Sequence, residues 1–431
     1  MTKGFLLRPS DTSNFALLMI ASLLYLLNFT TGSDIISLFL TLLLVLYVFG
    51  ATRANLLPTM IYLSFFTGVM VYGGIYLSFF VVLAFFLRVT LDGAFRAKDL
   101  LFYFTIYFVI HFISTGLGNL SVARMGEVLS FFLVLPAGYA FSKCKSKDCI
   151  IYFITGFFVS TIFGYARKYL PRLDKVAGDT DVTLLENMAE TYRFSGISND
   201  SNFYAILAIA VLFVLLFKIR MSYQAQKSNG DFIIVALVFV TFALGLVTYS
   251  KSYVLCAFFL FAIYFIRVKK LSLVYSIAVV FISLIAFYFF SSSISAIESA
   301  YMLRFGDDRT DLDMITSNRT VIWADYMKEM SNFSFSQMFF GNGMNLNGKV
   351  AAHNTFIQLL YEFGIIGFIT NLILLYKSKK VFVSKKLAKN SFVIMALMVV
   401  LFFNLSGYSF SSAWAVFTIM FVCCSNNDVM V

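Results

Sequence analysis

Long apolar runs, separated by polar segments, recur from one end of this 431-residue chain to the other. A helix needs roughly 20 apolar residues to cross a bilayer, and about fourteen runs approach that length. We predict spans at roughly 14–30, 35–50, 56–72, 76–91, 100–116, 125–142, 149–165, 201–219, 232–248, 253–266, 271–290, 353–376, 391–405 and 410–424. No small-residue cleavage site follows the first run, so we expect a retained span and not a signal peptide.

The pattern therefore predicts an all-α polytopic membrane protein with about 12–14 transmembrane helices. The stretch 56–91 is apolar almost throughout, and we divide it at Gly73-Gly74. We expect one integral membrane domain made of N-terminal helices (1–165), a first large outer loop (166–200), central helices (201–290), a second large outer loop (291–352) and C-terminal helices (353–431).

Composition agrees with this class. Hydrophobic residues make up 60% of the chain, aromatic residues 18% and charged residues only 13%. Soluble globular domains have about 25% charged residues, so this balance excludes one.

The distribution of lysine and arginine between alternate loops predicts the orientation. With a cytoplasmic N-terminus, most basic residues fall in cytoplasmic loops, and the short outer loops hold only Arg124 and Lys251. Both termini are then cytoplasmic and both large loops lie outside. The net charge of +11 follows from this bias. It does not indicate a nucleic-acid partner, because the basic residues are scattered among short loops.

The two large outer loops carry basic residues against this trend: Arg167, Lys168, Arg172, Lys175, Arg193, Arg304, Arg309, Arg319, Lys328 and Lys349. A phosphate ligand is one explanation, because guanidinium groups bind phosphate oxygens in pairs. Neutralisation by aspartates and glutamates of the same loops is the other. On charge alone the second explanation is favoured, and both stay open at this point.

Asn318-Arg319 opens a predicted short amphipathic helix. Arg319, Trp323, Tyr326 and Met330 share one of its faces, which suits a helix lying on the outer leaflet with Trp323 at headgroup depth. A simple interfacial anchor helix is the alternative interpretation.

His353, one of only two histidines, lies in AAHNTFIQLLYEFGIIG, where a polar segment gives way to an apolar run. Helical periodicity puts Ile357, Leu360, Gly364 and Gly367 on its face, and the glycines would let a neighbouring helix approach closely. The positive end of the helix dipole disfavours imidazolium, so we expect a neutral ring able to accept a proton. For an isolated histidine at a membrane boundary, a purely structural role is the more common one.

His353-Asn354 with Gly364 and Gly367 resembles the signature of the O-antigen ligase and Wzy-type polymerase superfamily. Three further pieces follow in the family's order: Arg193-Phe194-Ser195-Gly196 with Asn202, then Ser250-Lys251, then Asn318-Arg319 with Trp323. The resemblance covers roughly 190–370. Lys251 stands where the family has arginine and Asn318 where it has glycine, and lysine lacks the bidentate fork of arginine.

The resemblance implies a GT-C-like fold with short amphipathic helices in two large periplasmic loops of a bacterial inner-membrane protein. It implies a metal-independent glycosyltransferase, without a cofactor, whose partner is an undecaprenyl-pyrophosphate-linked oligosaccharide. His353 would act as base, with Arg193 and Arg319 as phosphate-binding catalytic residues. Other expected substrate contacts are Lys251, Asn202, Asn354, Arg304, Arg309 and Trp323, and Gly196, Gly364 and Gly367 would be structural. A chain-length-regulating co-polymerase is a further implied partner.

Alternatives remain. Asp311-Leu312-Asp313 matches a DxD metal-binding pattern, although paired carboxylates are common in acidic loops. A lipid-linked glycan flippase would carry ionisable residues near mid-membrane, whereas these spans are nearly free of charge. Within the superfamily, a polymerase is favoured over a ligase that transfers glycan to the lipid A core. Glu362 is expected to pair with a loop cation and not to act as the acid.

Overall fold

The structure is a computed structural model, and it describes residues 9–66, 70–71, 75–92, 149–169, 194, 196, 201–224, 231–248, 250–267, 319–343, 352 and 354–382. Five of the expected spans (100–116, 125–142, 271–290, 391–405 and 410–424) lie outside these ranges, as does most of both large outer loops.

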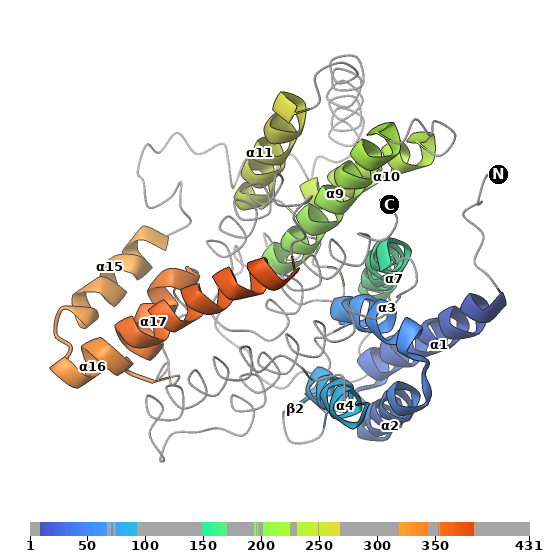
Figure 1. Ribbon diagram of the computed structural model, residues 1–431, viewed down its shortest axis with the longest axis horizontal. Coiled ribbons are helices and arrows are strands. Elements are labelled where there is room, and N and C mark those ends of the chain that lie inside the picture. Colours follow the sequence, from blue (N-terminus) through green and yellow to red (C-terminus); the bar gives the residue numbers. More distant parts are fainter. Residues whose placement is uncertain are drawn as a thin grey trace.

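The described residues are almost entirely helical, so the all-α prediction is confirmed for this part of the chain (Figure 1). The elements are α1 (Pro9–Thr31), α2 (Asp34–Gly50), α3 (Arg53–Leu63), η1 (Ser64–Phe66), β1 (Met70–Val71), β2 (Ile75–Tyr76), α4 (Leu77–Leu91), α7 (Cys149–Tyr169), α9 (Ser201–Gln224), α10 (Asp231–Leu246), α11 (Lys251–Arg267), α15 (Arg319–Met330), α16 (Phe335–Phe340) and α17 (Thr355–Phe382). The strands β1 and β2 form a minimal antiparallel pair.

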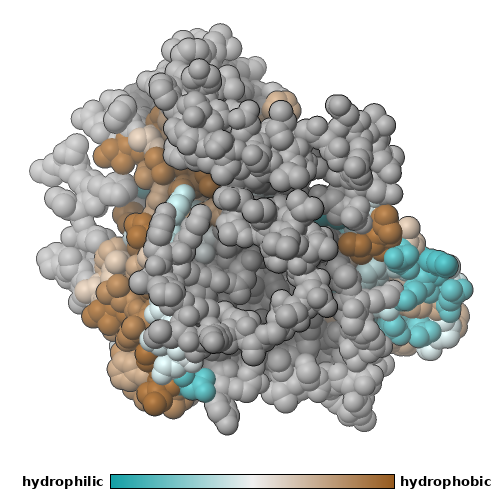
Figure 2. Space-filling model, turned by 180° about the vertical axis from the view of Figure 1, so that it is seen from behind, coloured by the Kyte–Doolittle hydropathy of each residue, from teal (hydrophilic) through white to brown (hydrophobic). Residues whose placement is uncertain are grey.

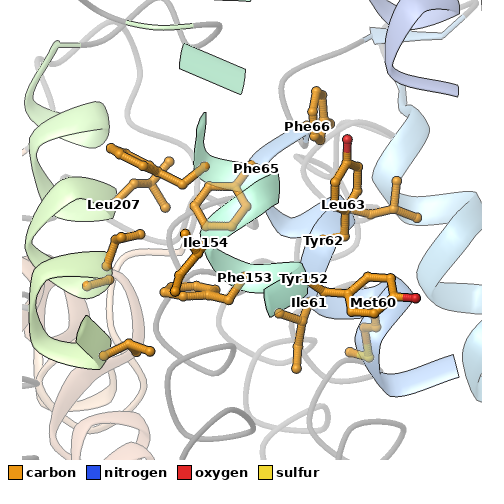
Figure 3. Packing of buried hydrophobic residues seen from close by; sticks show 14 of the residues in the cluster. Met60, Ile61, Tyr62, Leu63, Phe65, Phe66, Tyr152, Phe153, Ile154 and Leu207 are labelled. Carbon is orange, nitrogen blue, oxygen red and sulfur yellow. The ribbon is translucent and has the colours of Figure 1, made fainter. Parts of the chain in front are cut away.

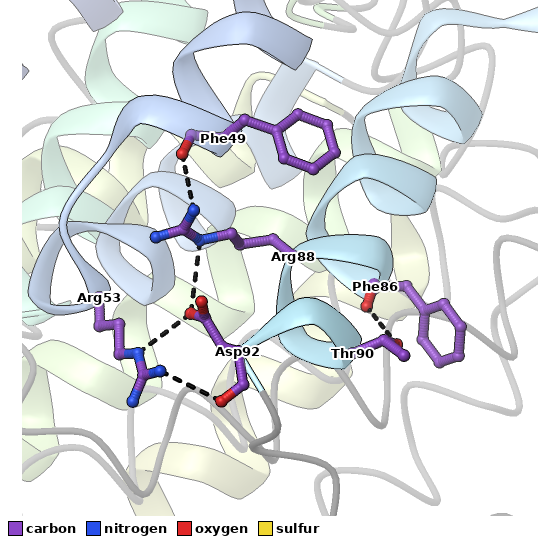
Figure 4. A network of polar contacts seen from close by, with 6 residues as sticks. All are labelled: Phe49, Arg53, Phe86, Arg88, Thr90 and Asp92. Carbon is purple, nitrogen blue, oxygen red and sulfur yellow. Dashed lines mark hydrogen bonds and ion pairs between the residues drawn. The ribbon is translucent and has the colours of Figure 1, made fainter.

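The apolar stretch 56–91 is divided, but the span expected over 56–72 is not one helix, because α3 ends at Leu63 and is followed by η1 and β1. The strand pair lies between α3 and α4, and its antiparallel pairing means that the chain reverses between Val71 and Ile75. Arg53, at the start of α3, and Asp92, just after α4, are consequently neighbours: Arg53 Nε lies 3.0 Å from Asp92 Oδ2. Arg88 Nε lies 3.3 Å from the same oxygen, and Arg88 also donates to the Phe49 carbonyl at the end of α2 (Figure 4). Ends of three helices therefore meet at one ionic cluster.

One helix among the described residues, α7, is both long and apolar enough over Cys149–Ala166 to cross a membrane. The other apolar helical stretches are shorter, at Asn14–Asn28, Asp34–Gly50, Phe79–Leu91, Tyr204–Leu216, Ile233–Leu246 and Phe356–Thr370.

A continuous core joins α1–α4, α7, α9, α10 and α11, and two residues of α17, Leu359 and Phe363, belong to it. Aromatic rings fill its centre: Phe65 of η1 lies 5.0 Å from Phe153 of α7, between centroids (Figure 3). In apolar surroundings, close backbone packing and side-chain hydrogen bonds hold helices together. Gly156 of α7 allows close backbone packing, because a Cβ there would lie 3.0 Å from the Tyr62 carbonyl oxygen.

Buried hydroxyl and amide groups form side-chain hydrogen bonds between the helices. Asn14 of α1 donates to the hydroxyl of Tyr152 in α7 at 3.0 Å, and the hydroxyls of Ser22 and Tyr62 lie 2.9 Å apart. Thr161 and Tyr204 pair in the same way, linking α7 to α9. Each pair connects helices that are far apart in sequence.

The outward faces of several described helices are strongly apolar (Figure 2). Ile35 is 79% exposed, Leu38 64% and Phe258 68%. Further exposed apolar side chains on α1, α2, α10 and α17 are Leu23, Leu27, Leu42, Leu46, Ile233, Ile369, Leu372 and Ile373. Such extensive exposure is unusual for a soluble monomer and typical of a lipid-facing surface.

The helix α17 is not straight. Gly364 has φ +64° and ψ −168°, which interrupts the helix after Phe363. The continuous helical face expected for Ile357, Leu360, Gly364 and Gly367 therefore does not form. Gly364 does permit a close approach, as expected, but the partner is the backbone of α16: a Cβ on Gly364 would lie 2.5 Å from the Phe339 carbonyl oxygen.

Candidate functional site

Asn354 begins α17 as its N-cap. Its side-chain oxygen accepts hydrogen bonds from the backbone N–H groups of Phe356 at 3.0 Å and Ile357 at 3.3 Å. These are two of the donors that every helix start leaves without an intrahelical partner. Asn354 was expected to bind substrate, but it is buried and its carbonyl oxygen caps the helix.

Ala352 is fully buried, and both of its backbone polar groups are bound by side chains. Its N–H donates to Gln358 Oε1 at 2.8 Å, from the first turns of α17. Its carbonyl accepts the indole N–H of Trp323 in α15, also at 2.8 Å. The two residues that flank His353 in sequence, Ala352 and Asn354, thus each have specific hydrogen-bond partners.

The helix α15 packs on the first part of α17, on one side of the molecule (Figure 1). Its face formed by Trp323, Tyr326 and Met330 joins Ile357 and Tyr361 in a small apolar cluster. The predicted helix and its start at Arg319 are correct. This face packs on protein: α17 provides the apolar surface that covers it.

Gln358 and Glu362 are both buried and lie one turn apart on α17. The Gln358 side-chain amide donates to Glu362 Oε1. The sequence predicts a loop cation as the partner of Glu362, and the structure pairs Glu362 with this amide. Gln358 was not singled out, although a Gln-x-x-x-Glu pair in an otherwise apolar helix was a usable signal.

The segment after α16 is bound to α17 through its backbone. Asn342 N–H donates to the Tyr361 carbonyl at 2.8 Å, and Gly343 N–H donates to the Glu362 carbonyl at 3.0 Å. These carbonyls would have been bonded within the helix if α17 were regular at Gly364. A capping box of Ser334 and Gln337 starts α16 itself.

Side chains extend this contact. The Tyr361 hydroxyl donates to Glu329 Oε2 of α15 at 2.8 Å and accepts from the Asn342 amide at 3.0 Å. The Gln337 amide donates in turn to Asn342 Oδ1. One hydroxyl of α17, that of Tyr361, therefore connects this helix to α15 and to the segment that follows α16.

A second group of motif residues gathers where α7, α9, α10 and α11 meet. Phe194 N–H donates to the Val247 carbonyl at 3.2 Å, and the Phe194 ring stacks on Tyr165 with centroids 4.3 Å apart. Gly196 has φ +62°, and a Cβ on Gly164 of α7 would lie 2.5 Å from its backbone. The backbone of Gly196 therefore lies in close contact with α7.

Asn202 and Ser250 link the starts of α9 and α11. The Ser250 hydroxyl donates to Asn202 Oδ1 at 3.2 Å. Lys251 is the first residue of α11 and follows Ser250 directly. The motif pieces containing Asn202, Lys251 and Phe194, which are up to 57 positions apart in the printed sequence, thus fall in one neighbourhood.

Four expected site residues, His353, Arg193, Arg304 and Arg309, lie outside the described residues. Arg319 is partly buried at the start of α15, and Gly367 is buried within α17. No group of three or more His, Cys, Asp or Glu side chains arranged to hold a metal occurs in the described ranges.

Burial raises the pKa of Tyr326 to about 12, with the neighbouring Glu362 adding to the shift and a hydrogen bond from Gln358 opposing it. Low-dielectric surroundings disfavour the phenolate, and a nearby carboxylate disfavours it further. Tyr326 is therefore a neutral partner of Gln358 and Glu362 at physiological pH.

No protein-family model, curated protein or solved structure matches the chain.

Proposed function

We propose that this chain is a polytopic glycosyltransferase of the bacterial inner membrane, a polysaccharide polymerase of the Wzy type. It would join undecaprenyl-pyrophosphate-linked repeat units on the periplasmic face. One observation carries the proposal. Phe194, next to Arg193, is hydrogen-bonded to Val247 after α10, and Ser250, next to Lys251, is hydrogen-bonded to Asn202 at the start of α9. The motif residues beside Arg193 and Lys251 therefore lie together where the ends of α7, α9, α10 and α11 meet.

The exposed apolar faces support a membrane location, because Ile35, Leu38 and Phe258 would meet lipid and not water. The contact of Arg53 with Asp92 supports the alternating topology, because both residues belong to loops expected in the cytoplasm. The site proposed at Arg193 and Lys251 lies in loops expected on the other side.

The chemistry requires a base and a cationic site for the leaving group. The imidazole of His353 would take the proton of the acceptor hydroxyl as its oxygen forms a bond to the anomeric carbon. The bond from that carbon to the pyrophosphate oxygen breaks, and the electron pair leaves with the lipid pyrophosphate. Arg193 and Arg319, with Lys251, would stabilise this charge, because guanidinium and ammonium groups keep their charge throughout.

Deletion of the gene, followed by electrophoresis of the surface polysaccharide, tests the proposal. A polymerase deletion removes the ladder of long chains and leaves a single repeat unit on the core. Loss of every unit would identify a ligase instead, and would overturn the polymerase assignment.

Reconstitution tests the reaction class. Purified protein in detergent, with lipid-linked repeat units, is expected to elongate glycan without any vesicle compartment. A flippase cannot do so, and absence of product would contradict the enzyme proposal. Activity is expected to persist in EDTA, whereas its loss would favour a metal at Asp311 and Asp313.

A further inference from the structure

We propose that α16 lies on the outer leaflet of the membrane, with its apolar face of Phe335, Met338 and Phe339 inserted where the lipid headgroups meet the acyl chains. The binding partner of this face is the phospholipid leaflet itself. The same geometry places α15 and the part of α17 before Gly364 outside the hydrocarbon core. This inference rests on the membrane location and the outer placement of the loop in the proposed function, and it is independent of glycosyl transfer.

The exposure of α17 changes at its bend. From 356 to 363 every side chain is buried or half-buried, because α15, α16 and the main core cover this part of the helix (Figure 1). After the bend an exposed apolar stripe begins: Ile365, Ile369, Leu372 and Ile373. The spacing i, i+4, i+7 and i+8 puts these four side chains on one helical face. Among the described residues of α17, only those after the bend therefore present a surface suited to lipid.

Charged side chains of α15 stand beside the first part of α17. Asp325 and Lys328 are exposed, whereas the opposite face of α15 packs on α17. Hydrogen bonds of Trp323 and Glu329 hold α15 beside the chain from Ala352 into the first turns of α17. An ionised side chain that faces hydrocarbon is costly. We therefore place α15, and the part of α17 that it accompanies, outside the hydrocarbon core.

The helix α16 carries no charged residue and has one apolar face. Phe335, Met338 and Phe339 follow the helical spacing i, i+3 and i+4, and the rings of Phe335 and Phe339 lie 4.8 Å apart between centroids. Phe335 is 78% exposed, and Met338 is exposed as well. A capping box at Ser334 fixes where the helix begins. The helix therefore presents a defined apolar face that no other described element covers.

This apolar face adjoins the stripe on α17. A Cβ on Gly364 would lie 2.5 Å from the Phe339 carbonyl oxygen, so the backbones of α16 and α17 touch at the bend. Ile365, the first residue of the stripe, follows Gly364 directly. A short helix with an apolar face beside a lipid-facing surface suits a position in the plane of the membrane interface. The leaflet that surrounds the stripe is therefore the partner we assign to α16.

Uncharged polar residues precede α16 and share its surface, and all of them are exposed: Ser331, Asn332, Ser334 and Ser336. Hydroxyl and amide groups form hydrogen bonds with headgroup oxygens without contributing a net charge. Interfacial helices that select anionic lipid are instead rich in lysine and arginine. We therefore expect α16 to bind a zwitterionic phospholipid surface without any requirement for anionic lipid.

Quenching of tryptophan fluorescence by brominated phosphatidylcholine tests the inference, with the full chain reconstituted in vesicles of that lipid. Trp323→Phe and Trp414→Phe remove both native tryptophans, and each variant then receives one new tryptophan. For Phe335→Trp we expect about a twofold loss of fluorescence with bromine near the headgroup end of the acyl chain, because interfacial helices insert only roughly 5–10 Å. Bromine at the middle of the chain should quench it less. Thermal unfolding of each variant shows beforehand that it is folded.

Three further positions serve as matched controls. Ile369→Trp lies in the stripe of α17, beyond the bend, and should be quenched at least as strongly by bromine at the middle of the chain. Ser336→Trp replaces an exposed residue on another side of α16, and Lys328→Trp replaces an exposed residue of α15. Both should be quenched by acrylamide from the water and only weakly by either brominated lipid.

The outcomes separate this inference from the proposed function. Absence of lipid quenching in Ile369→Trp would overturn the membrane location and the proposed function with it. Lipid quenching of Ile369→Trp without quenching of Phe335→Trp would overturn the placement of α16 alone, and acrylamide would then distinguish exposure to water from cover by protein. Quenching of Lys328→Trp as strong as that of Phe335→Trp would contradict the position of α15. Quenching of Phe335→Trp only after addition of phosphatidylglycerol would contradict the zwitterionic surface.

Discussion

Gly341 and Gly364 lie back to back where α16 meets the kink of α17: a Cβ added to Gly364 would lie 2.6 Å from the Gly341 backbone nitrogen. Both have positive φ, +81° and +64°. The two backbones approach as closely as this only because neither carries a side chain.

Gly364→Ala should therefore destabilise the protein. Positive φ combined with extended ψ costs about 1–3 kcal/mol for a residue with a side chain, and overlap with the Phe339 carbonyl adds about 1–3 kcal/mol. Thermal unfolding in detergent measures the effect. Gly50→Ala is the control, because a Cβ there meets no atom within 4 Å, and it should be neutral or slightly stabilising. Equal melting temperatures for the two variants would contradict this account of the junction.

Asp92→Asn should weaken the packing of α2, α3 and α4. It removes the charge shared by Arg53 and Arg88, and only 15% of the Asp92 side chain is exposed. Hydrogen bonds to charged groups contribute about 1.5–3 kcal/mol, and we expect a loss in the lower part of that range because Arg53 is half exposed. Asp34→Asn, an exposed carboxylate at the start of α2, is the control in the same unfolding experiment. A loss no larger than that of the control would mean that the cluster is not stabilising.

Stability should fall with alkaline pH in a way that depends on Tyr326. Its pKa is about 12 in the folded protein against 10.0 ordinarily. Between these values the unfolded chain has released the phenolic proton and the folded chain has not, so the free energy of unfolding decreases as pH rises. Below about pH 10 the contribution is constant. Unfolding measured across this window should depend less on pH in Tyr326→Phe than in wild type, and parallel curves would contradict the assignment.

His353→Ala, Arg193→Ala and Arg319→Ala should each abolish polymer while the protein remains at normal levels in the membrane. Removal of a general base costs typically 10²–10⁴-fold, and removal of a leaving-group cation acts on the same transition state. Lys328→Ala removes an exposed cation from the helix that Arg319 begins, and should leave the ladder intact. Wild-type polymer in His353→Ala would exclude the histidine as base.

Local features were predictable from sequence because they depend on nearby residues. Hydropathy located α1, α2, α7, α9 and α10 to within a few residues, and the start of α15 at Arg319 is as expected. The cap formed by Asn354 follows from a residue type that favours this position, although it was assigned to substrate instead.

Features that depend on distant segments were not predictable. Helical periodicity treats α17 as straight, whereas the kink at Gly364 needs donors from Asn342 and Gly343, about twenty residues earlier. The role of Trp323 depends in the same way on Ala352. A pattern of apolar residues shows that a face is buried but not what buries it. This is why the sequence predicts the apolar face of α15 to lie on a leaflet, whereas the structure packs it on α17.

The kink has a mechanical consequence for the segment that follows α16. The Tyr361 and Glu362 carbonyls take their hydrogen bonds from Asn342 and Gly343. Moving this segment away from α17 would break both hydrogen bonds, each of which contributes about 0.5–1.5 kcal/mol. The segment from α16 to Gly343 is thus held to α17 at its bend, and we expect the two parts to move together.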